Sequence, residues 1–144
     1  MAHNRHSGVA LALGCAVAAA FSSGAGAVEV NDLKGFEQLF GRYAPAGDCK
    51  RQPQFIVDVS GFTFEVGGKT EKVTNPEFAA SYGGNDYSGS SLWFFPFRTN
   101  DGYEILMTFE AGEKSGVVTI DLHESKASPR NAALIKGSPY AKCK

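Results

Sequence analysis

The sequence predicts a mainly β protein: a small antiparallel barrel or sandwich of six to eight strands, preceded by one N-terminal amphipathic helix. Three observations lead to this prediction. From residue 54 onward, apolar and polar residues alternate with a period of two, which is typical of strands that bury one face. Turn-forming residues separate these short segments, as they do in barrels and sandwiches. Over residues 31–43, by contrast, apolar residues recur every three or four positions, which favours a helix.

The first 27 residues have the organisation of a secretory signal peptide. Arg5 provides a positive start, residues 9–21 form an apolar run, and the segment 25–27 (Ala-Gly-Ala) offers small residues at a cleavage site. The apolar run is too short to cross a bilayer as a helix. We therefore expect cleavage after Ala27 and a periplasmic or secreted protein. A lipoprotein signal at Cys15 is an alternative that fits less well, because the apolar run continues past this cysteine.

Residues 28–144 have the length of a single compact domain. This part of the chain keeps two cysteines, Cys49 and Cys143. An even pair of cysteines in an exported protein predicts one disulfide, which would join the start of the fold to its last residues. A metal site on the two cysteines is not expected, since His123 is the only histidine in this part of the chain.

The charges of this domain are balanced and dispersed. It holds all 15 acidic residues and 13 of the 14 basic residues, so its formal charge is −2. This balance predicts no general attraction to nucleic acid or to an anionic membrane. No second apolar segment is long enough to cross a bilayer, so no transmembrane span is expected in the mature chain. No phosphate loop, dinucleotide fingerprint or calcium loop is present, and we predict no cofactor.

The predicted helix over residues 31–43 carries one apolar stripe. An Asn-Asp pair at its start can supply the cap, and Gly41 followed by Pro45 marks its end. Gly35 weakens the prediction, because glycine inside a helix costs about 1 kcal/mol relative to alanine. The stripe consists of Leu33, Phe36, Leu39, Phe40 and Tyr43.

The predicted strands follow in order, separated by turn signals. Gly67-Gly68 suits a tight hairpin turn, and Asn100-Asp-Gly102 is a second strong turn signal. Between the first two segments, Ser60-Gly61 suggests a bulge or a bend rather than a hairpin. Residues 131–136 fit either a short strand or a helical turn. The strand segments themselves are 54–60, 62–66, 69–73, 77–82, 91–98, 103–110 and 117–123.

The segment Ser91–Arg98 is rich in aromatic residues. As a strand it divides its side chains between two faces: Trp93, Phe95 and Phe97 on one, Leu92, Phe94 and Pro96 on the other. One face can fill the barrel, and the predicted helix can cover Phe94 and Pro96 on the second face. The alternative is that Phe94 and Pro96 form an exposed apolar patch that binds a partner.

A long segment at residues 81–91 joins two predicted strands and mixes tyrosine with glycine and small polar residues. This composition suits recognition, because tyrosine offers rigid aromatic area and its small neighbours offer adaptable hydrogen bonds. Loops on rigid scaffolds often carry function. The alternative is a solvated connection, with Tyr82 or Tyr87 folded back on the barrel. The residues predicted to contact a ligand are Tyr82, Asn85, Asp86, Tyr87, Ser88 and Ser90.

Signals for catalysis are weak, and we predict a protein without catalytic residues. Asp121 and His123 share a predicted strand face, but no nucleophile accompanies them, so a surface histidine at a strand end is the better interpretation. The acidic residues include no distinctive pair for glycoside cleavage. A small periplasmic hydrolase that acts through scattered carboxylates is the remaining alternative from the enzyme class.

Residues 62–97 and the late cysteine form a layout that can be compared with a known family. Its parts are Phe64-Glu-Val-Gly-Gly-Lys-Thr70, Tyr82-Gly-Gly-Asn-Asp-Tyr-Ser-Gly89 and a Trp-containing strand. This layout resembles the small exported bacterial inhibitors of C-type lysozyme. The resemblance implies an eight-stranded antiparallel barrel with disulfide support, and a loop, here Gly83–Tyr87, that inserts into the lysozyme cleft.

The chain departs from that family at two positions of the loop. The family has a serine where Gly83 stands, and the acidic Asp86 does not suit a carboxylate-lined cleft. The resemblance therefore supports a barrel and a binding role better than it supports lysozyme as the target.

The leading hypothesis is an exported, non-catalytic binding protein that recognises a protein or cell-envelope ligand through the loop 82–91. Inhibition of a peptidoglycan-cleaving enzyme such as a lysozyme is the runner-up. A barrel that holds a small apolar ligand is a third hypothesis, and the 11 phenylalanines of the chain argue against it because they can fill the interior.

Overall fold

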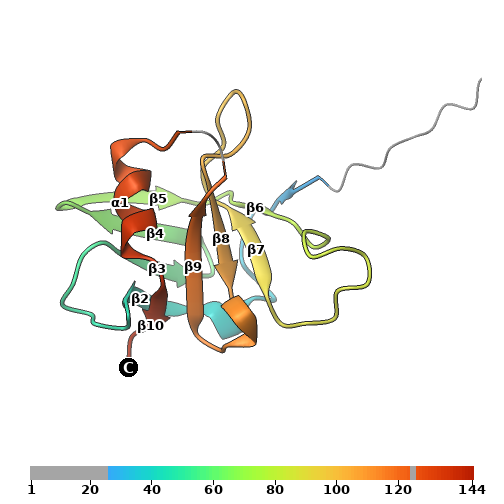
Figure 1. Cartoon of the computed structure of the whole chain (residues 1–144), viewed down its shortest axis with the longest axis horizontal. Coiled ribbons are helices and arrows are strands. Elements are labelled where there is room, and N and C mark those ends of the chain that lie inside the picture. Colours follow the sequence, from blue (N-terminus) through green and yellow to red (C-terminus); the bar gives the residue numbers. More distant parts are fainter. Residues whose placement is uncertain (1–25, 124–125) are drawn as a thin grey trace, which may run out of the picture.

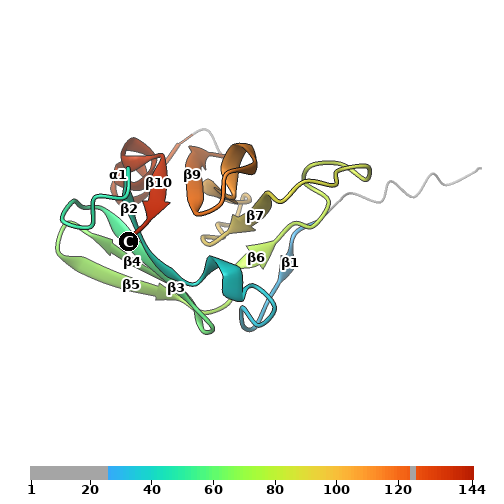
Figure 2. The same ribbon diagram turned by 90° about the horizontal axis from the view of Figure 1, so that it is seen from below.

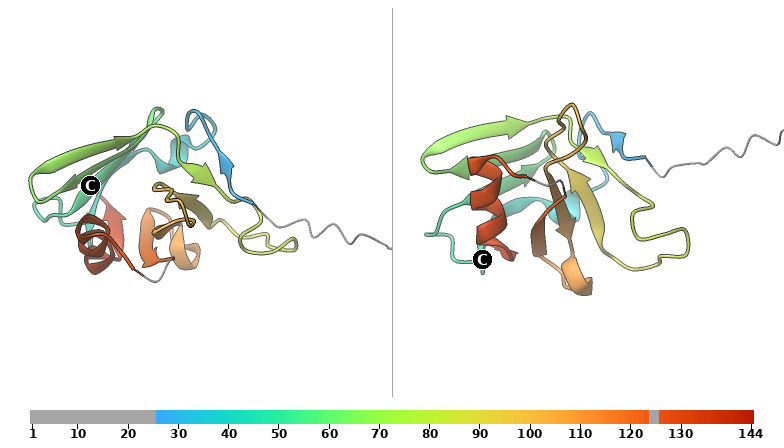
Figure 3. Two further views of the ribbon diagram at one scale, coloured as in Figure 1. Left: turned by 90° about the horizontal axis from the view of Figure 1, so that it is seen from above. Right: turned by 45° about the horizontal axis from the view of Figure 1, so that its top comes forward.

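A computed structural model describes residues 26–123 and 126–144. The predicted signal peptide and the alternative lipoprotein signal at Cys15 lie outside the described residues, apart from Gly26 and Ala27. Within the described ranges, ten strands form one antiparallel sheet in the order β1-β6-β7-β8-β9-β10-β2-β3-β4-β5. The sheet curls into a half-barrel (Figures 1 and 3), so the prediction of a mainly β antiparallel fold is confirmed.

Seven strands coincide with predicted segments: β3 (Gln54–Asp58), β4 (Gly61–Val66), β5 (Lys69–Val73), β6 (Glu77–Phe78), β7 (Leu92–Phe95), β8 (Ile105–Phe109) and β9 (Val117–Leu122). Three further strands raise the number above the six to eight predicted: β1 (Val28–Glu29), β2 (Gly41–Pro45) and β10 (Tyr140–Lys142). These three are only two to five residues long. Such short pairings leave too little alternation in the sequence to be recognised.

The predicted N-terminal helix over residues 31–43 is wrong. Only a 3-10 turn, η1 (Glu37–Leu39), lies there, and the chain then enters β2, which pairs with β3 and β10. Gly35 and Gly41 have φ angles of 90° and 146°, which are incompatible with a helix. The apolar residues of this segment are spaced as they are because an irregular stretch of chain buries them. The backbone conformation of residues 41–45 is set by strand pairing. Three members of the apolar stripe have no exposed surface: Leu33, Leu39 and Tyr43.

One α-helix, α1 (Pro129–Gly137), lies near the C-terminus and packs against β9 and β4 (Figure 1). Its start is defined by Ser128, whose hydroxyl accepts a hydrogen bond from the Asn131 N–H at 3.4 Å, and by Pro129 in the first helical position. Leu134 anchors the helix in the core, where it has no exposed surface. Of the two structures that the sequence allowed for residues 131–136, the helical one is therefore formed.

β3 and β4 form a hairpin around Val59 and Ser60, where the sequence suggested a bulge or a bend. Asp58 pairs directly with Gly61 in this hairpin. Gly61 has a φ angle of 121°, and a Cβ atom there would lie 2.1 Å from the main-chain oxygen of Val73 in β5. Glycine is required at this position because β4 and β5 approach each other closely. In the sequence, a glycine of this kind cannot be distinguished from a glycine at a bend.

Aromatic rings fill the inside of the half-barrel, whose curvature is seen end-on in Figure 2. Phe62 and Phe109 stack with ring centroids 5.8 Å apart, and Tyr43 stacks on Phe55 at 4.9 Å. The fully buried members of this core are Leu33, Leu39, Tyr43, Phe55, Phe62, Phe94, Ile105, Met107, Phe109, Val118, Ile120, Leu134 and Tyr140.

The predicted disulfide between Cys49 and Cys143 is present, with the two Cα atoms 5.9 Å apart and 94 positions apart in the sequence. It fastens the β2–β3 connection to the segment that follows β10. Such a bond is compatible with an exported protein. No helix in the described part of the chain is long and apolar enough to cross a membrane.

The aromatic strand β7 turns Phe94 into the core and Trp93 to the other face of the sheet. Phe94 points into the core with no exposed surface, and Pro96 is buried as well, so they do not form an exposed patch. The ring of Phe36, from the segment predicted as a helix, lies 5.2 Å from that of Phe94. Trp93 and Phe95 instead lie on the outer face of the sheet, in a second, smaller apolar cluster.

Candidate binding surface

The loop 79–91 connects β6 to β7 and extends away from the sheet, at the end of the molecule opposite α1 (Figures 1 and 2). Two main-chain hydrogen bonds fold its middle: the Gly84 N–H donates to the Ser81 oxygen at 2.9 Å, and the Tyr87 N–H donates to the Gly84 oxygen at 3.2 Å. The segment is thus a sequence of turns rather than an extended tether.

The outer face of β7, its neighbouring strands and the loop carry a cluster of aromatic rings that we call the aromatic platform: Tyr82, Tyr87, Trp93, Phe95 and Tyr103. Trp93 lies between the two loop tyrosines, with ring centroids 5.6 Å from Tyr82 and 5.0 Å from Tyr87. Phe95 and Tyr103 continue the cluster, with their centroids 4.4 Å apart. Tyr82 is 48% exposed and is therefore the ring most open to a ligand.

Glu113, at the end of the 3-10 turn η2 (Ala111–Glu113), fastens the second half of the loop. One carboxylate oxygen accepts the Tyr87 hydroxyl at 2.5 Å, and the other accepts the Ser90 N–H at 2.5 Å and the Ser90 hydroxyl at 2.7 Å. Ser91 closes the arrangement by donating its N–H to the Tyr87 hydroxyl at 2.7 Å. These hydrogen bonds favour the charged carboxylate and lower the pKa of Glu113 to about 2.

The backbone of Glu113 adopts an uncommon conformation. Its φ angle is 60°, and that of Glu110 at the start of η2 is 52°, both in the left-handed region that residues other than glycine seldom occupy. Backbone strain of this kind clusters at functional sites. Here the strained residues lie at the two ends of η2, whose last residue turns its carboxylate towards the loop.

Two glycines of the loop are required by close packing. A Cβ atom at Gly83 would lie 2.6 Å from the Trp93 ring, and one at Gly89 would lie 2.3 Å from the Tyr87 hydroxyl oxygen. Either contact would displace a ring of the aromatic platform. The glycines in this segment therefore specify one arrangement of the loop.

A buried carboxylate supports the other end of the aromatic platform. Glu77 in β6 is 5% exposed and accepts hydrogen bonds from the Tyr103 hydroxyl and from Arg98, the latter at 3.0 Å. The hydrogen bond to Glu77, with the partial burial of the ring, raises the pKa of the Tyr103 hydroxyl. Tyr103 is consequently fixed in position and neutral at physiological pH.

The six loop residues predicted to contact a ligand fall into two groups. Tyr87 and Ser90 donate their hydroxyls to Glu113, so they hold the loop in shape. The other four side chains are exposed: Tyr82, Asn85, Asp86 and Ser88.

Sequence reasoning missed Glu113, because no local motif links it to a loop more than 20 residues earlier. It also missed the outward orientation of Trp93. Side chains alternate between the two faces of β7, but this alternation does not tell which of the two faces is turned towards the core.

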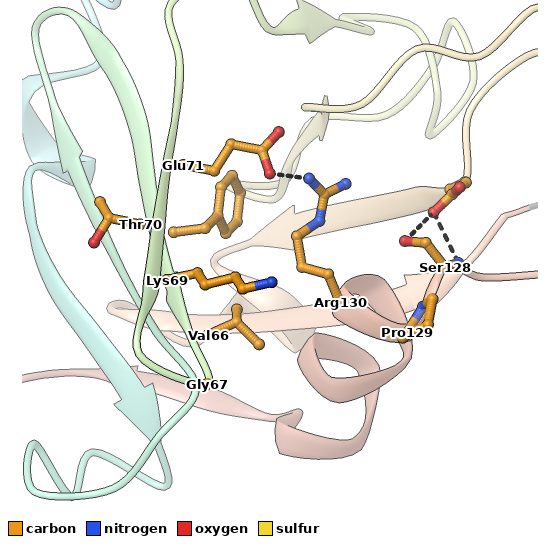
Figure 4. Close-up of a pocket in the computed structure, with 10 residues that line it drawn as sticks. Val66, Gly67, Lys69, Thr70, Glu71, Ser128, Pro129 and Arg130 are labelled. Atoms are coloured by element: carbon orange, nitrogen blue, oxygen red, sulfur yellow. Dashed lines mark hydrogen bonds and ion pairs between the residues drawn. The ribbon is translucent and has the colours of Figure 1, made fainter.

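A groove lies at the opposite end of the molecule, between β5 and the start of α1 (Figure 4). Its volume is about 740 Å³, and Phe64 and Val66 are among the residues that line it. Arg130 reaches across it from α1 to form an ion pair with Glu71 of β5, and Lys69 points into the same space (Figure 4). The Arg130 guanidinium lies 3.7 Å from the centre of the Phe97 ring.

Glu104 holds the start of α1 at the rim of this groove. Its carboxylate accepts the Ser128 N–H at 3.1 Å, the Ser128 hydroxyl at 2.9 Å and the side-chain amide of Asn131. Burial alone would raise the pKa of Glu104, but the hydrogen bonds from Ser128 and Asn131 outweigh it, and the pKa is lowered. Asn131 has no exposed surface and completes the network by accepting from Arg130 Nε at 2.9 Å.

Asp121 and His123 do not form a hydrogen-bonded pair among the described residues. The His123 ring instead lies against the aromatic platform, 5.1 Å from Phe95 and 6.0 Å from Tyr103. The described ranges also contain no group of three or more histidine, cysteine or acidic side chains placed to hold a metal ion.

The chain was compared with protein-family models, with curated proteins and with solved structures, and no significant match was found in any of the three.

Proposed function

We propose that the protein is an exported, non-catalytic binding protein that recognises a protein or cell-envelope ligand through the loop 79–91 and the aromatic platform. The observation that carries the proposal is the position of Tyr82: nearly half of its surface is exposed, and its ring rests against Trp93. Large aromatic side chains presented to solvent in a fixed orientation are characteristic of recognition surfaces.

Preorganisation strengthens this proposal. The bonds from Glu113 to Tyr87 and Ser90 fix the loop before any ligand arrives, so little conformational entropy remains to be lost on binding. Asn85, Asp86 and Ser88 are exposed in the same loop and offer amide, carboxylate and hydroxyl groups to a ligand. Such a combination of apolar area and a few polar groups suits specific binding.

Affinity capture from envelope extract tests the proposal. Residues 28–144, immobilised and oxidised, should retain a ligand that the Tyr82→Ala variant no longer retains, while the two melting temperatures agree within about 2 °C, as expected for a substitution at an exposed position. Val59→Ala is the matched control, because Val59 is 45% exposed at the distant β3–β4 hairpin. If Tyr82→Ala lowers the melting temperature strongly but leaves capture unchanged, the tyrosine belongs to the core and the proposal fails.

Inhibition of a peptidoglycan-cleaving enzyme is the second candidate. It is favoured by the exposure of Asn85 and Asp86, because they lie in the part of the loop, Gly83–Tyr87, that resembles the inserted loop of the lysozyme inhibitors. The purified protein should then slow a C-type, g-type or i-type lysozyme at stoichiometric concentration, and Asp86→Asn should change the inhibition. Full activity of all three enzymes would reject this candidate.

A further inference from the structure

Among the strands of the described residues, β5 forms one end of the sheet: it pairs with β4 on one side, and none of these strands pairs with it on the other. The two-residue turn Gly67-Gly68 makes Val66 and Lys69 the first hydrogen-bonded pair of this hairpin. By alternation, the main-chain groups of Thr70 and Lys72 point away from β4. Within the described ranges, no main-chain hydrogen bond outside the β4–β5 ladder involves β5.

A continuous groove follows this free edge. The groove of Figure 4 is joined by a second hollow of about 470 Å³, which extends along residues 71–75 towards Pro96 and Arg98. The two hollows share Glu71 and Arg130 in their walls. We call the combined feature the β5 groove. It therefore accompanies β5 from its first residue to its last.

The β5 groove carries an excess of positive charge. Its walls contain four basic and two acidic side chains, whereas residues 28–144 as a whole carry a formal charge of −2. Glu104 is occupied by the hydrogen bonds from Ser128 and Asn131. In the described part of the chain, Lys69 and Lys72 form no ion pair. The charged side chains are Lys69, Lys72, Arg98 and Arg130 against Glu71 and Glu104.

Arg130 is held in a fixed orientation in the β5 groove. Its guanidinium lies on the Phe97 ring, and its Nε atom donates to the buried Asn131. Glu71, which pairs with one Nη atom, is about half exposed, so this ion pair is screened by water and can be exchanged for another carboxylate. The second Nη atom can donate to a further acceptor.

We propose that the β5 groove binds an extended, acidic peptide segment of a partner protein, which adds as a further strand to β5. The main chain of the segment pairs with Thr70 and Lys72, as in other recognition by strand addition. Lys69 and Lys72 point to opposite faces of β5, so carboxylates on one face of the segment meet Lys69 and Arg130 and a carboxylate on the other face meets Lys72. Charge complementarity and a free strand edge thus point to the same kind of ligand.

A second copy of this chain is a poorer occupant. Antiparallel pairing of two β5 strands must join the outward main-chain groups of Thr70 and Lys72, and a register centred on Glu71 or on Lys72 sets two like charges opposite each other. Like charges directly across a strand pair are destabilising. A register centred on Thr70 instead brings Lys72 opposite the turn residue Gly68, so only the Thr70 pair forms ladder hydrogen bonds. Lysines on an edge strand protect it against such self-pairing while leaving it open to an acidic partner.

Two synthetic hexapeptides test the proposal by NMR titration of the oxidised domain. Acetyl-Glu-Val-Glu-Val-Glu-Val-amide should shift the amide signals of Thr70 and Lys72 and slow their hydrogen exchange, and raised salt should weaken the effect. Acetyl-Lys-Val-Lys-Val-Lys-Val-amide should cause neither change. Equal shifts with both peptides, shifts confined to other strands, or no shift at millimolar acidic peptide would overturn the proposal.

Substitutions at one edge position separate main-chain pairing from charge. Thr70→Pro removes the outward N–H group but is tolerated on an edge strand, and it should weaken binding of the acidic peptide at least about tenfold. Thr70→Ala keeps the N–H group and should bind like the parent protein. Lys69→Ala/Lys72→Ala should weaken binding to a similar extent without loss of folding, because both side chains are exposed. Unchanged affinity in either weakened variant would contradict the proposal.

This site is independent of the aromatic platform. Tyr82→Ala should leave binding of the acidic peptide unchanged, and Lys69→Ala/Lys72→Ala should leave ligand capture by the loop unchanged. Sedimentation velocity without peptide provides the remaining check: a dimer that Lys72→Glu abolishes would assign the β5 edge to a second copy and overturn the proposal.

Discussion

Two glutamates at opposite ends of the molecule make nearly the same bonds for different purposes. Glu113 accepts the N–H and hydroxyl of Ser90 in the loop 79–91, and Glu104 accepts the N–H and hydroxyl of Ser128 at the start of α1. Each has a lowered pKa because these donors favour the charged carboxylate. The same carboxylate–serine arrangement therefore fixes a recognition loop in one place and begins a helix in the other.

The surroundings of the two arrangements differ. Glu104 also accepts from Asn131, which has no exposed surface, and the helix that follows buries Leu134 completely. The loop contributes no fully buried side chain, and Glu113 itself is exposed to solvent. Substitution of Glu104 should thus lower the free energy of unfolding of the whole domain, whereas substitution of Glu113 should change the structure of the loop alone. The following predictions test this difference, starting with the largest expected effect.

Removal of the disulfide tests how far the C-terminal part of the fold, α1 and β10, depends on a bond other than those of Glu104. Cys49→Ser/Cys143→Ser should lower the free energy of unfolding by about 4–5 kcal/mol, because the bond closes a long loop between cysteines that are 94 positions apart. Urea denaturation with and without a reducing agent measures the change. The reduced parent protein serves as the control and should match the double variant. A loss below about 1 kcal/mol would mean that the sheet alone holds β10 in place.

Glu104→Ala should lower the free energy of unfolding by about 2–3 kcal/mol. The substitution leaves the buried amide of Asn131 and the N–H of Ser128 without their acceptor, and buried donors without partners are costly. Urea denaturation gives the value. Glu71→Ala is the matched control and should cost about 0–1 kcal/mol, since its ion pair with Arg130 is about half exposed. Equal losses in the two variants would remove the distinction between Glu104 and a surface ion pair.

Acid should release the loop before it affects the fold. The pKa of Glu113 is about 2 in the folded protein and 4.5 ordinarily, so its contribution is complete above pH 4.5 and is lost as the pH falls towards 2. The amide proton signal of Ser90 should move upfield over this range while those of the core strands stay in place. In Glu113→Gln, the Ser90 amide proton should have its low-pH chemical shift at every pH. A Ser90 signal that does not respond to pH would contradict the role of Glu113.

Gly89→Ala should have the smallest effect on stability and a local effect on structure. The added methyl group would lie 2.3 Å from the Tyr87 hydroxyl oxygen and from a Glu113 carboxylate oxygen, so the loop has to move away from Glu113. The melting temperature should stay within about 2 °C of the parent value, because the loop contributes no fully buried side chain. Ser88→Ala is the control, because Ser88 is an exposed neighbour of Gly89 in the same loop. Hydrogen exchange at Ser90 and Ser91 should be faster only in the Gly89 variant.

The sequence was sufficient for the parts of the fold that follow local rules. Alternating apolar residues located β3, β4, β8 and β9, and the aromatic run located β7. The Gly67-Gly68 turn located β5, and the count of cysteines predicted the disulfide. The sequence was insufficient where distant pairing decides: residues 31–43 have helical spacing, but the chain from Gly41 onward forms β2, between β3 and β10. The loop residues were predicted as a group, but their division into ligand-facing and structural members depends on Glu113, which lies on another element.

The orientation of β7 illustrates the same limit. Trp93 and Phe94 are both large and apolar, so the pattern of apolar residues does not distinguish them. Only the position of the core in the folded protein shows that Phe94 lies inside. Similarly, the β5 groove consists of residues from β4, β5, α1 and the segment between β7 and β8, and these residues share no motif. A groove of this kind forms only when the curved sheet brings residues from separate elements together, so it cannot be found in the sequence.

The chain contains one tryptophan, and that residue is Trp93, between Tyr82 and Tyr87. The intrinsic fluorescence of the protein, excited at the indole band, therefore originates within the proposed recognition surface. Occupancy of that surface can be followed by emission from the unlabelled protein, and a ligand bound only at the β5 groove should leave the spectrum unaltered.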